Sequence, residues 1–174
     1  MGYPSPLCSP PLPRGVRFAE EVPLRFMVPL SPPPDVATLD QYGNCTDPHA
    51  IEKVAQFVSM LPFLRDSDLF ENMNVTDLWL NSQEFVNFGY SDWEEHAILL
   101  ANYFLAIDKY RQNNIETYCL IGEAIPEGDT VFVLRKCKDP EEGSKTPAFE
   151  IWNPDTGVIS QPLPCFSAFR ECSP

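Results

Sequence analysis

Apolar residues recur at helical spacing in a stretch that begins at Asp47 and ends at Pro62, which predicts an amphipathic helix. Asp47 stands in the N-cap position and Pro48 in the first helical position. The predicted apolar face consists of Ile51, Val54, Phe57, Val58 and Leu61. A second, shorter helix is predicted from Ser82, and Gly89 occupies the position of its C-terminal cap. These two helices precede the most apolar stretch of the chain.

That stretch is predicted to form the main helix, which runs to about Ala106. Ser91 and Glu94 have the spacing of a capping box and mark its start. His96 lies beside the apolar stripe, and a lone histidine in such a position is expected to be structural rather than catalytic. The residues at helical spacing are Ala97, Leu100, Ala101, Phe104 and Leu105. Because the helix is apolar on nearly all sides, we expect it to be central and buried.

Beyond the main helix the apolar pattern changes from helical to extended. Strands are predicted over residues 117–124, 130–137 and 148–152, which are rich in β-branched and aromatic residues. Residues 126–129 and 153–157 have the composition of turns. Helices followed by an antiparallel meander are the pattern of an α+β domain, here with a core helix packed on the sheet.

The first 34 residues hold ten of the nineteen prolines, which excludes a continuous helix or a central strand there. We therefore divide the chain into a Pro-rich, largely extended segment (1–34), a domain (35–157) and a weakly structured tail (158–174). Pro10 to Arg14 has the composition of a polyproline ligand for an SH3 domain, but such runs are more often plain linkers.

The chain is strongly acidic, with a formal net charge of −13. Nucleic acids and anionic membrane surfaces need basic patches, so the charge argues against both as partners. No apolar run is long enough to span a bilayer, and the N-terminus lacks the basic and apolar regions of a signal peptide. We expect an intracellular protein without direct membrane insertion, in which the glycosylation sequons at Asn44 and Asn74 are unused.

The six cysteines are scattered without a C-x-x-C pair and are expected to be free thiols. Cys45 and His49 could form half of a metal site, but the other half is missing, so we expect no metal and no cofactor. Cys119 or Cys137 could form a triad with His96 and a carboxylate. Both cysteines lie in apolar strands, where burial suppresses thiol reactivity, so catalysis by either is not expected.

The first turn of the main helix is acidic and contains an aromatic residue, with Asp92, Trp93, Glu94 and Glu95 in succession. These residues could form a rim that binds a peptide or a basic partner. Acidic side chains at a helix N-terminus also simply complement the helix dipole, which accounts for most of the pattern. Exposure of Trp93 would favour the rim, because a solvent-facing tryptophan is a natural interaction anchor.

Six sequence blocks carry a family resemblance. They are V-P-L-R-F from Val22, S-M-L-P-F from Ser59, D-L-W from Asp77, E-E-H-A-I-L-L-A-N-Y-F-L from Glu94, A-I-P-E-G from Ala124 and I-W-N-P from Ile151. In this order they resemble the C-terminal region of the coiled-coil and C2 domain-containing protein 2 family. The order of helix, strands and a final W-N-P-x-T-G is similar to the transglutaminase-like, papain-related fold. The family's coiled coil and C2 domain are absent here, so the resemblance implies a short isoform or fragment with a truncated domain.

Active members of that wider fold place a cysteine at the start of the core helix, a histidine at the start of a following strand and an aspartate before a proline in the next strand. The resemblance puts these roles at Trp93, Thr130 and Asn153. None of the three can perform its role, and shifting the alignment supplies no nucleophile because no cysteine lies between Cys45 and Cys119. The resemblance therefore implies a pseudoenzyme.

The resemblance further implies a scaffold for protein–protein contact in the ciliary transition zone. It implies an intracellular location at the base of the cilium, associated with the cytoskeleton, and a role in ciliogenesis with the proteins of the transition zone complex as partners. Two alternatives stay open. The chain could be an active cysteine peptidase or transglutaminase, or an unstable fragment without autonomous function.

Overall fold

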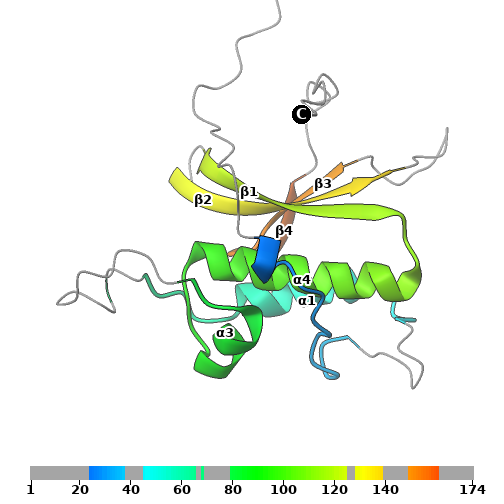
Figure 1. The fold of residues 1–174 in the computed structure, drawn as a ribbon, viewed down its shortest axis with the longest axis horizontal. Coiled ribbons are helices and arrows are strands. Elements are labelled where there is room, and N and C mark those ends of the chain that lie inside the picture. Colours follow the sequence, from blue (N-terminus) through cyan, green and yellow to red (C-terminus); the bar gives the residue numbers. More distant parts are fainter. Residues whose placement is uncertain are drawn as a thin grey trace, which may run out of the picture.

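A computed structural model of the chain describes residues 24–37, 45–65, 68, 79–124, 128–138 and 149–160. These residues form a layer of helices on one face of an antiparallel sheet, as Figure 1 shows. The prediction of a mixed α+β domain with its core helix on the sheet is confirmed. The helical elements are a 3-10 turn (Leu24–Phe26), α1 (Ala50–Ser59), α3 (Ser82–Phe88) and α4 (Trp93–Arg111), and the strands are β1 (Ile115–Ala124), β2 (Gly128–Cys137), β3 (Phe149–Asn153) and β4 (Val158–Ser160).

The sheet is a simple meander with the strand order β1-β2-β3-β4, and each neighbouring pair is antiparallel. Trp152 of β3 lies opposite Val133 of β2 on one side and Ile159 of β4 on the other. The three predicted strands are confirmed, although β1 and β2 each begin two residues earlier than expected, so that β2 includes the end of the predicted turn over 126–129. The predicted tail begins with β4, and its remainder from residue 161 lies outside the described residues.

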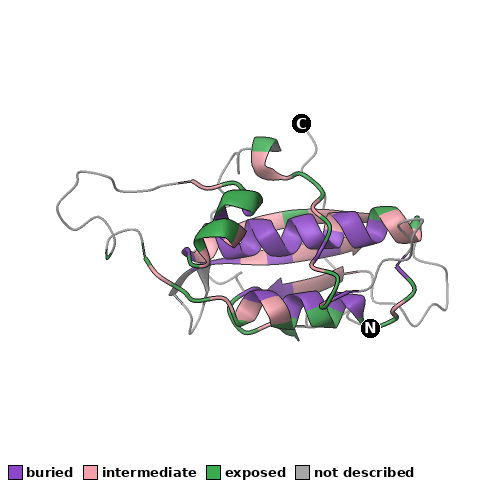
Figure 2. Ribbon diagram, turned by 90° about the horizontal axis from the view of Figure 1, so that it is seen from below, coloured by how far each residue is buried: buried purple, intermediate pink, exposed green. Residues whose placement is uncertain are grey.

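Helix α4 is the centre of the fold, with thirteen of its nineteen residues buried. It contacts β1 and β2 on one side and α1 and α3 on others, so it needs apolar residues around most of its circumference. Figure 2 shows α1 beside α4, with buried residues along both. The prediction of a central buried helix is confirmed, but Leu105 is only half-buried and the helix continues past Ala106. It ends where Gln112 turns into the left-handed region with φ 55°.

Helix α1 buries the predicted apolar residues Ile51, Val54 and Val58 but begins later than expected. Its N-cap is His49, so the prediction that Asp47 caps the helix is wrong. The Asp47 carboxylate instead accepts hydrogen bonds from the His49 backbone N–H and from Lys53, which stabilise a turn before the helix.

Helix α3 is confirmed with both of its predicted ends. Asn81 caps it in a capping box with Glu84, and Gly89 ends it in the left-handed conformation with φ 79°. Part of the Pro-rich segment packs against α4, because the Leu30 N–H donates to the Asn102 carbonyl (3.1 Å) and the Asn102 side chain donates to the Phe26 carbonyl (2.8 Å). The polyproline motif at Pro10 to Arg14 lies outside the described residues.

A buried ion-pair network joins α4 to the sheet. Arg135 of β2 is 5% exposed and donates to both carboxylate oxygens of Asp108 in α4, at 2.7 Å and 3.2 Å. It also pairs with Glu150 of β3, and its guanidinium lies 5.1 Å from the centre of the Phe104 ring. The network therefore fixes the register of α4 against two strands.

Candidate functional site

The start of α4 is built differently from the predicted capping box. Asp92 is the N-cap, and its side chain makes no capping hydrogen bond. The Ser91 hydroxyl donates to Glu95 (2.9 Å), and the other Glu95 oxygen accepts from the Leu80 backbone N–H (3.0 Å). The prediction that Ser91 pairs with Glu94 in a capping box is wrong. Glu95 instead ties the start of α4 to the chain that leads into α3.

Three carboxylates gather at this helix start. One oxygen from each of Asp92, Glu94 and Glu95 lies within 4.8 Å of the others. Asp92 and Glu95 are buried, with 7% and 2% exposure, and only Trp93 and Glu94 of the predicted rim are half-buried. Burial and hydrogen bonding to Glu95 and Glu94 raise the pKa of Asp92 to about 10. The surface that a partner could reach here therefore consists of Trp93 and Glu94.

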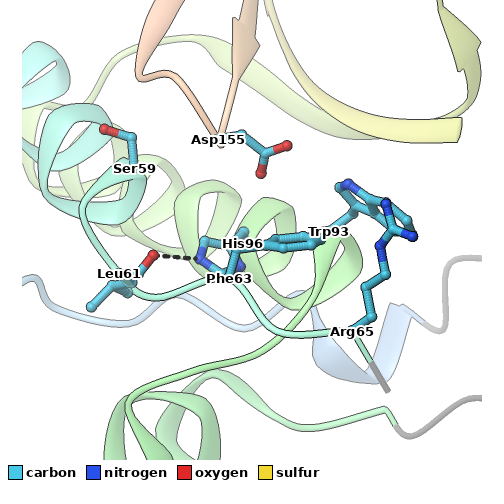
Figure 3. A pocket seen from close by; sticks show the side chains of 7 residues that line it. All are labelled: Ser59, Leu61, Phe63, Arg65, Trp93, His96 and Asp155. Atoms are coloured by element: carbon cyan, nitrogen blue, oxygen red, sulfur yellow. Dashed lines mark hydrogen bonds between the residues drawn. The ribbon is translucent and has the colours of Figure 1, made fainter. Parts of the chain in front are cut away.

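Trp93 lines a pocket between α1, α4 and the turn after β3. The cavity has a volume of about 240 Å³, and Figure 3 shows Asp155 on one side of it with His96, Phe63 and Trp93 on the other. The Phe63 and Trp93 ring centres are 5.2 Å apart, and the Arg65 guanidinium lies 5.3 Å from the centre of the Trp93 ring. The pocket residues are Ser59, Leu61, Phe63, Arg65, Trp93, His96 and Asp155.

Asp155 reaches the pocket because of a glycine. The turn between β3 and β4 presses against α1 at Gly157, where an added Cβ would lie 3.0 Å from the Ala55 carbonyl oxygen. Gly157 also has φ +66°, which favours glycine. Asp155 is exposed overall, but partial desolvation of its carboxyl group raises the pKa of Asp155, and the nearby His96 opposes this rise. The carboxyl group thus faces the aromatic wall across the cavity.

His96 has structural contacts on both ring nitrogens. Nδ1 lies 2.7 Å from the Asp92 carbonyl oxygen, and Nε2 lies 3.3 Å from the Leu61 carbonyl oxygen. Its ring also packs against Phe85, with 4.7 Å between the centres. Because both nitrogens face backbone carbonyls, His96 holds the segment after α1 against the start of α4.

The three positions that the resemblance assigned to catalysis do not meet in this pocket. Trp93 lines it, but Thr130 is buried on β2 opposite Gly122 of β1. Asn153 is also buried, and its side-chain oxygen accepts from the N–H groups of Asp155 (2.9 Å) and Thr156 (3.3 Å). Asn153 therefore stabilises the turn that carries Asp155.

The sequence-based interpretation missed the pocket residues Phe63, Arg65 and Asp155, because periodicity says nothing about which loop side chains converge. The available signals were the predicted N-P-D-T-G turn, which contains Asp155, and the S-M-L-P-F block, which contains Phe63.

Comparison with known proteins identifies the family. Residues 77–171 match the CEP76 peptidase-like domain. The chain belongs to the CEP76 peptidase-like domain family. The human protein CC2D2B is 28% identical over 151 residues, which confirms the resemblance read from the sequence blocks. The match covers 86% of this chain but only 9% of that protein, so the chain spans about a tenth of the relative's length. No solved structure matches the chain.

Among the described residues, the cysteines Cys45, Cys119 and Cys137 are free thiols, and the last two lie within the matched domain. Burial raises the pKa of Cys119 to about 12, and its sulfur lies 3.7 Å from that of Met27. Cys45 is buried while His49 is exposed, and within the described ranges they belong to no group of three potential metal ligands. No helix in the described ranges has the length and apolar character needed to cross a bilayer.

Cys119 is expected to resist alkylation while the domain is folded. A pKa raised from 9.0 to about 12 lowers the thiolate fraction about a thousandfold at mildly alkaline pH, and the thiolate is the reactive form. Peptide mass spectrometry after iodoacetamide treatment, in buffer and in urea, measures the difference, with Cys137, which is half-buried like Cys119, as internal reference. Rapid, saturable modification of Cys119 in the folded protein would contradict this expectation and favour a thiol enzyme.

Proposed function

We propose that this chain is a non-catalytic peptidase-like domain that serves protein–protein contact in the ciliary transition zone. The proposal includes a location at the base of the cilium, association with the cytoskeleton, and proteins of the transition zone complex as partners. It rests on the similarity to the human protein CC2D2B and on the residues at the start of α4.

Trp93 is the observation that carries the contact function. It is the first residue of α4, where an enzyme of this fold would need its cysteine, and it is half-buried at the edge of the pocket. Its ring is preorganised by Phe63 and Arg65. Aromatic side chains fixed at the edge of a pocket are frequent hot spots of protein interfaces. The position thus supports contact rather than acyl transfer.

The other two assigned positions support the non-catalytic part of the proposal. Thr130 offers no base near neutral pH, and Asn153 cannot balance the charge of an imidazolium. The two described histidines give no replacement, because His49 is exposed before α1 and His96 bonds to backbone carbonyls. An active peptidase or transglutaminase would need a nucleophile that the start of α4 lacks.

Replacement of Trp93 is expected to remove transition zone proteins from the neighbourhood of this chain in ciliated cells. With a proximity-labelling enzyme fused to the chain, Trp93→Ala should lower their recovery about tenfold or more, since loss of an interface hot spot costs about 2 kcal/mol or more. Phe88→Ala is the matched control, because Phe88 is an exposed aromatic residue (58%) that does not line the pocket.

Urea unfolding of both variants shows that they fold, and a cooperative transition of the unaltered chain contradicts the alternative of an unstable fragment. Equal recovery of transition zone proteins with both variants would refute contact through Trp93. Turnover of peptide substrates, with saturable labelling of one cysteine by a thiol-reactive probe, would refute the non-catalytic role.

A further inference from the structure

The Asp92 carboxylate does not cap α4, although Asp92 occupies the N-cap position. Such a residue accepts a hydrogen bond from a backbone N–H of the first helical turn, but here the capping bond is absent. Its Oδ1 atom is buried and has no hydrogen-bond partner, and the residue is only 7% exposed. A buried carboxylate oxygen without a partner is strongly unfavourable, so this position favours either a proton or a positive ion.

The neighbouring carboxylates strengthen this requirement. Hydrogen bonds from the Ser91 hydroxyl and the Leu80 N–H hold the Glu95 side chain in one orientation. One of its oxygens lies within 4.8 Å of an oxygen of Asp92 and an oxygen of Glu94. Carboxylates this close repel each other unless a proton or a positive ion lies between them. In the described ranges, no basic side chain forms an ion pair with Asp92 or Glu95. The helix dipole favours acidic residues here, but it does not explain a buried carboxylate oxygen that accepts no hydrogen bond from the helix N–H groups.

We propose that Asp92, Glu94 and Glu95 bind a calcium ion at the start of α4. Calcium takes oxygen ligands, mainly carboxylates and waters, at about 2.3–2.6 Å, so two ligands on opposite sides of the ion lie up to about 5 Å apart. The three oxygens lie within 4.8 Å of one another, which fits this spacing. Magnesium is less suited, because it usually keeps several of its waters and binds through only one or two carboxylates.

The burial of the three residues fits an ion that enters from one side. Asp92 and Glu95 form the closed side of the site, while Glu94 is half-buried and borders solvent. Water can therefore complete the coordination next to Glu94. Because Glu95 also bonds to Leu80, the ion would join α4 to the chain that leads into α3. The site is separate from the contact proposed for Trp93 and stands or falls without it.

The proposal is tested on the full chain with terbium, which replaces calcium in oxygen sites and emits when a nearby tryptophan is excited. Trp93 directly follows Asp92 in sequence, so saturable emission at one equivalent is expected, with displacement by calcium. Calorimetric titration with calcium is expected to give a dissociation constant of about 10⁻⁴ M or tighter. Trp93→Phe should lower the terbium emission and leave the calcium titration unchanged.

Asp92→Asn and Glu94→Gln keep the shape of each side chain and are expected to weaken calcium binding at least tenfold. Glu52→Gln removes an exposed acid from the first turn of α1 and should change nothing. Circular dichroism of each variant shows that it is folded. Terbium emission that does not saturate, absence of heat on calcium addition, or equal binding by Asp92→Asn and Glu52→Gln would overturn the proposal. The cluster would then be neutralised by a proton on Asp92.

Discussion

Arg135→Met is expected to lower the free energy of unfolding by about 3–5 kcal/mol, because it leaves buried carboxylates without their partner. Asp108 is 4% exposed and accepts three of the guanidinium hydrogen bonds, and Glu150 accepts another. Methionine fills much of the same volume and can still lie over Phe104, so the loss reports charge rather than packing. Urea unfolding followed by circular dichroism measures it.

Two further variants distinguish the contribution of the buried ion pair to stability from that of an exposed ion pair. Lys138 and Glu116 form a surface ion pair of 3.1 Å with 47% and 35% exposure, so Lys138→Met should cost at most about 1 kcal/mol. Asp108→Leu combined with Arg135→Met should recover part of the loss, because the most buried charge is then also removed. A loss from Arg135→Met as small as that from Lys138→Met would show that the network does not hold α4 to the sheet.

Gly157→Ala is expected to cost about 2–4 kcal/mol, from strain in the left-handed region and from overpacking. The new Cβ would lie 3.0 Å from both the Ala55 carbonyl oxygen and the Ser59 hydroxyl, and 3.1 Å from the Gln56 Cα atom. Two of these contacts are with backbone, which cannot turn away as a side chain can. The turn should move off α1 and take Asp155 out of the pocket.

Gly89→Ala is the matched control for this prediction. Gly89 also has a positive φ, +79°, but an added Cβ would have no neighbour within 4 Å. It should therefore show the conformational strain alone, about 1 kcal/mol. Thermal or urea unfolding of the two variants gives the difference, which is the cost of the contact with α1. Equal losses would mean that the turn does not press against the helix.

The main elements of the fold could be predicted because each follows from a local pattern. An apolar stretch without polar faces indicates a helix covered on several sides, and Trp93–Arg111 has that environment. The extended pattern from residue 117, rich in β-branched and aromatic residues, indicates strands, and Gly89 indicates a helix end. These features depend on neighbours in sequence, so the sequence alone reveals them.

The details of the site depend on contacts between distant residues, which spacing cannot show. Ser91 and Glu94 have the correct separation for a capping box, but Ser91 bonds to Glu95, which also bonds to Leu80. The pocket residues Phe63 and Asp155 come from a loop and a turn whose directions are set by tertiary packing. Arg135 and Asp108 pair across 27 positions of sequence, so neither could be recognised as a buried charge.

The hydrogen bonds around Asn102 bear on how the protein can be shortened. The Asn102 side-chain amide donates to the Phe26 carbonyl and to the Ser82 hydroxyl, and the residue is 1% exposed. A fragment that starts at residue 35 would keep Ser82 and lose the Phe26 acceptor, which leaves a buried N–H group unsatisfied in the middle of α4. Such a fragment would also uncover the apolar surface that Leu30 now occupies. A minimal folding unit must therefore begin before Phe26, within the Pro-rich segment.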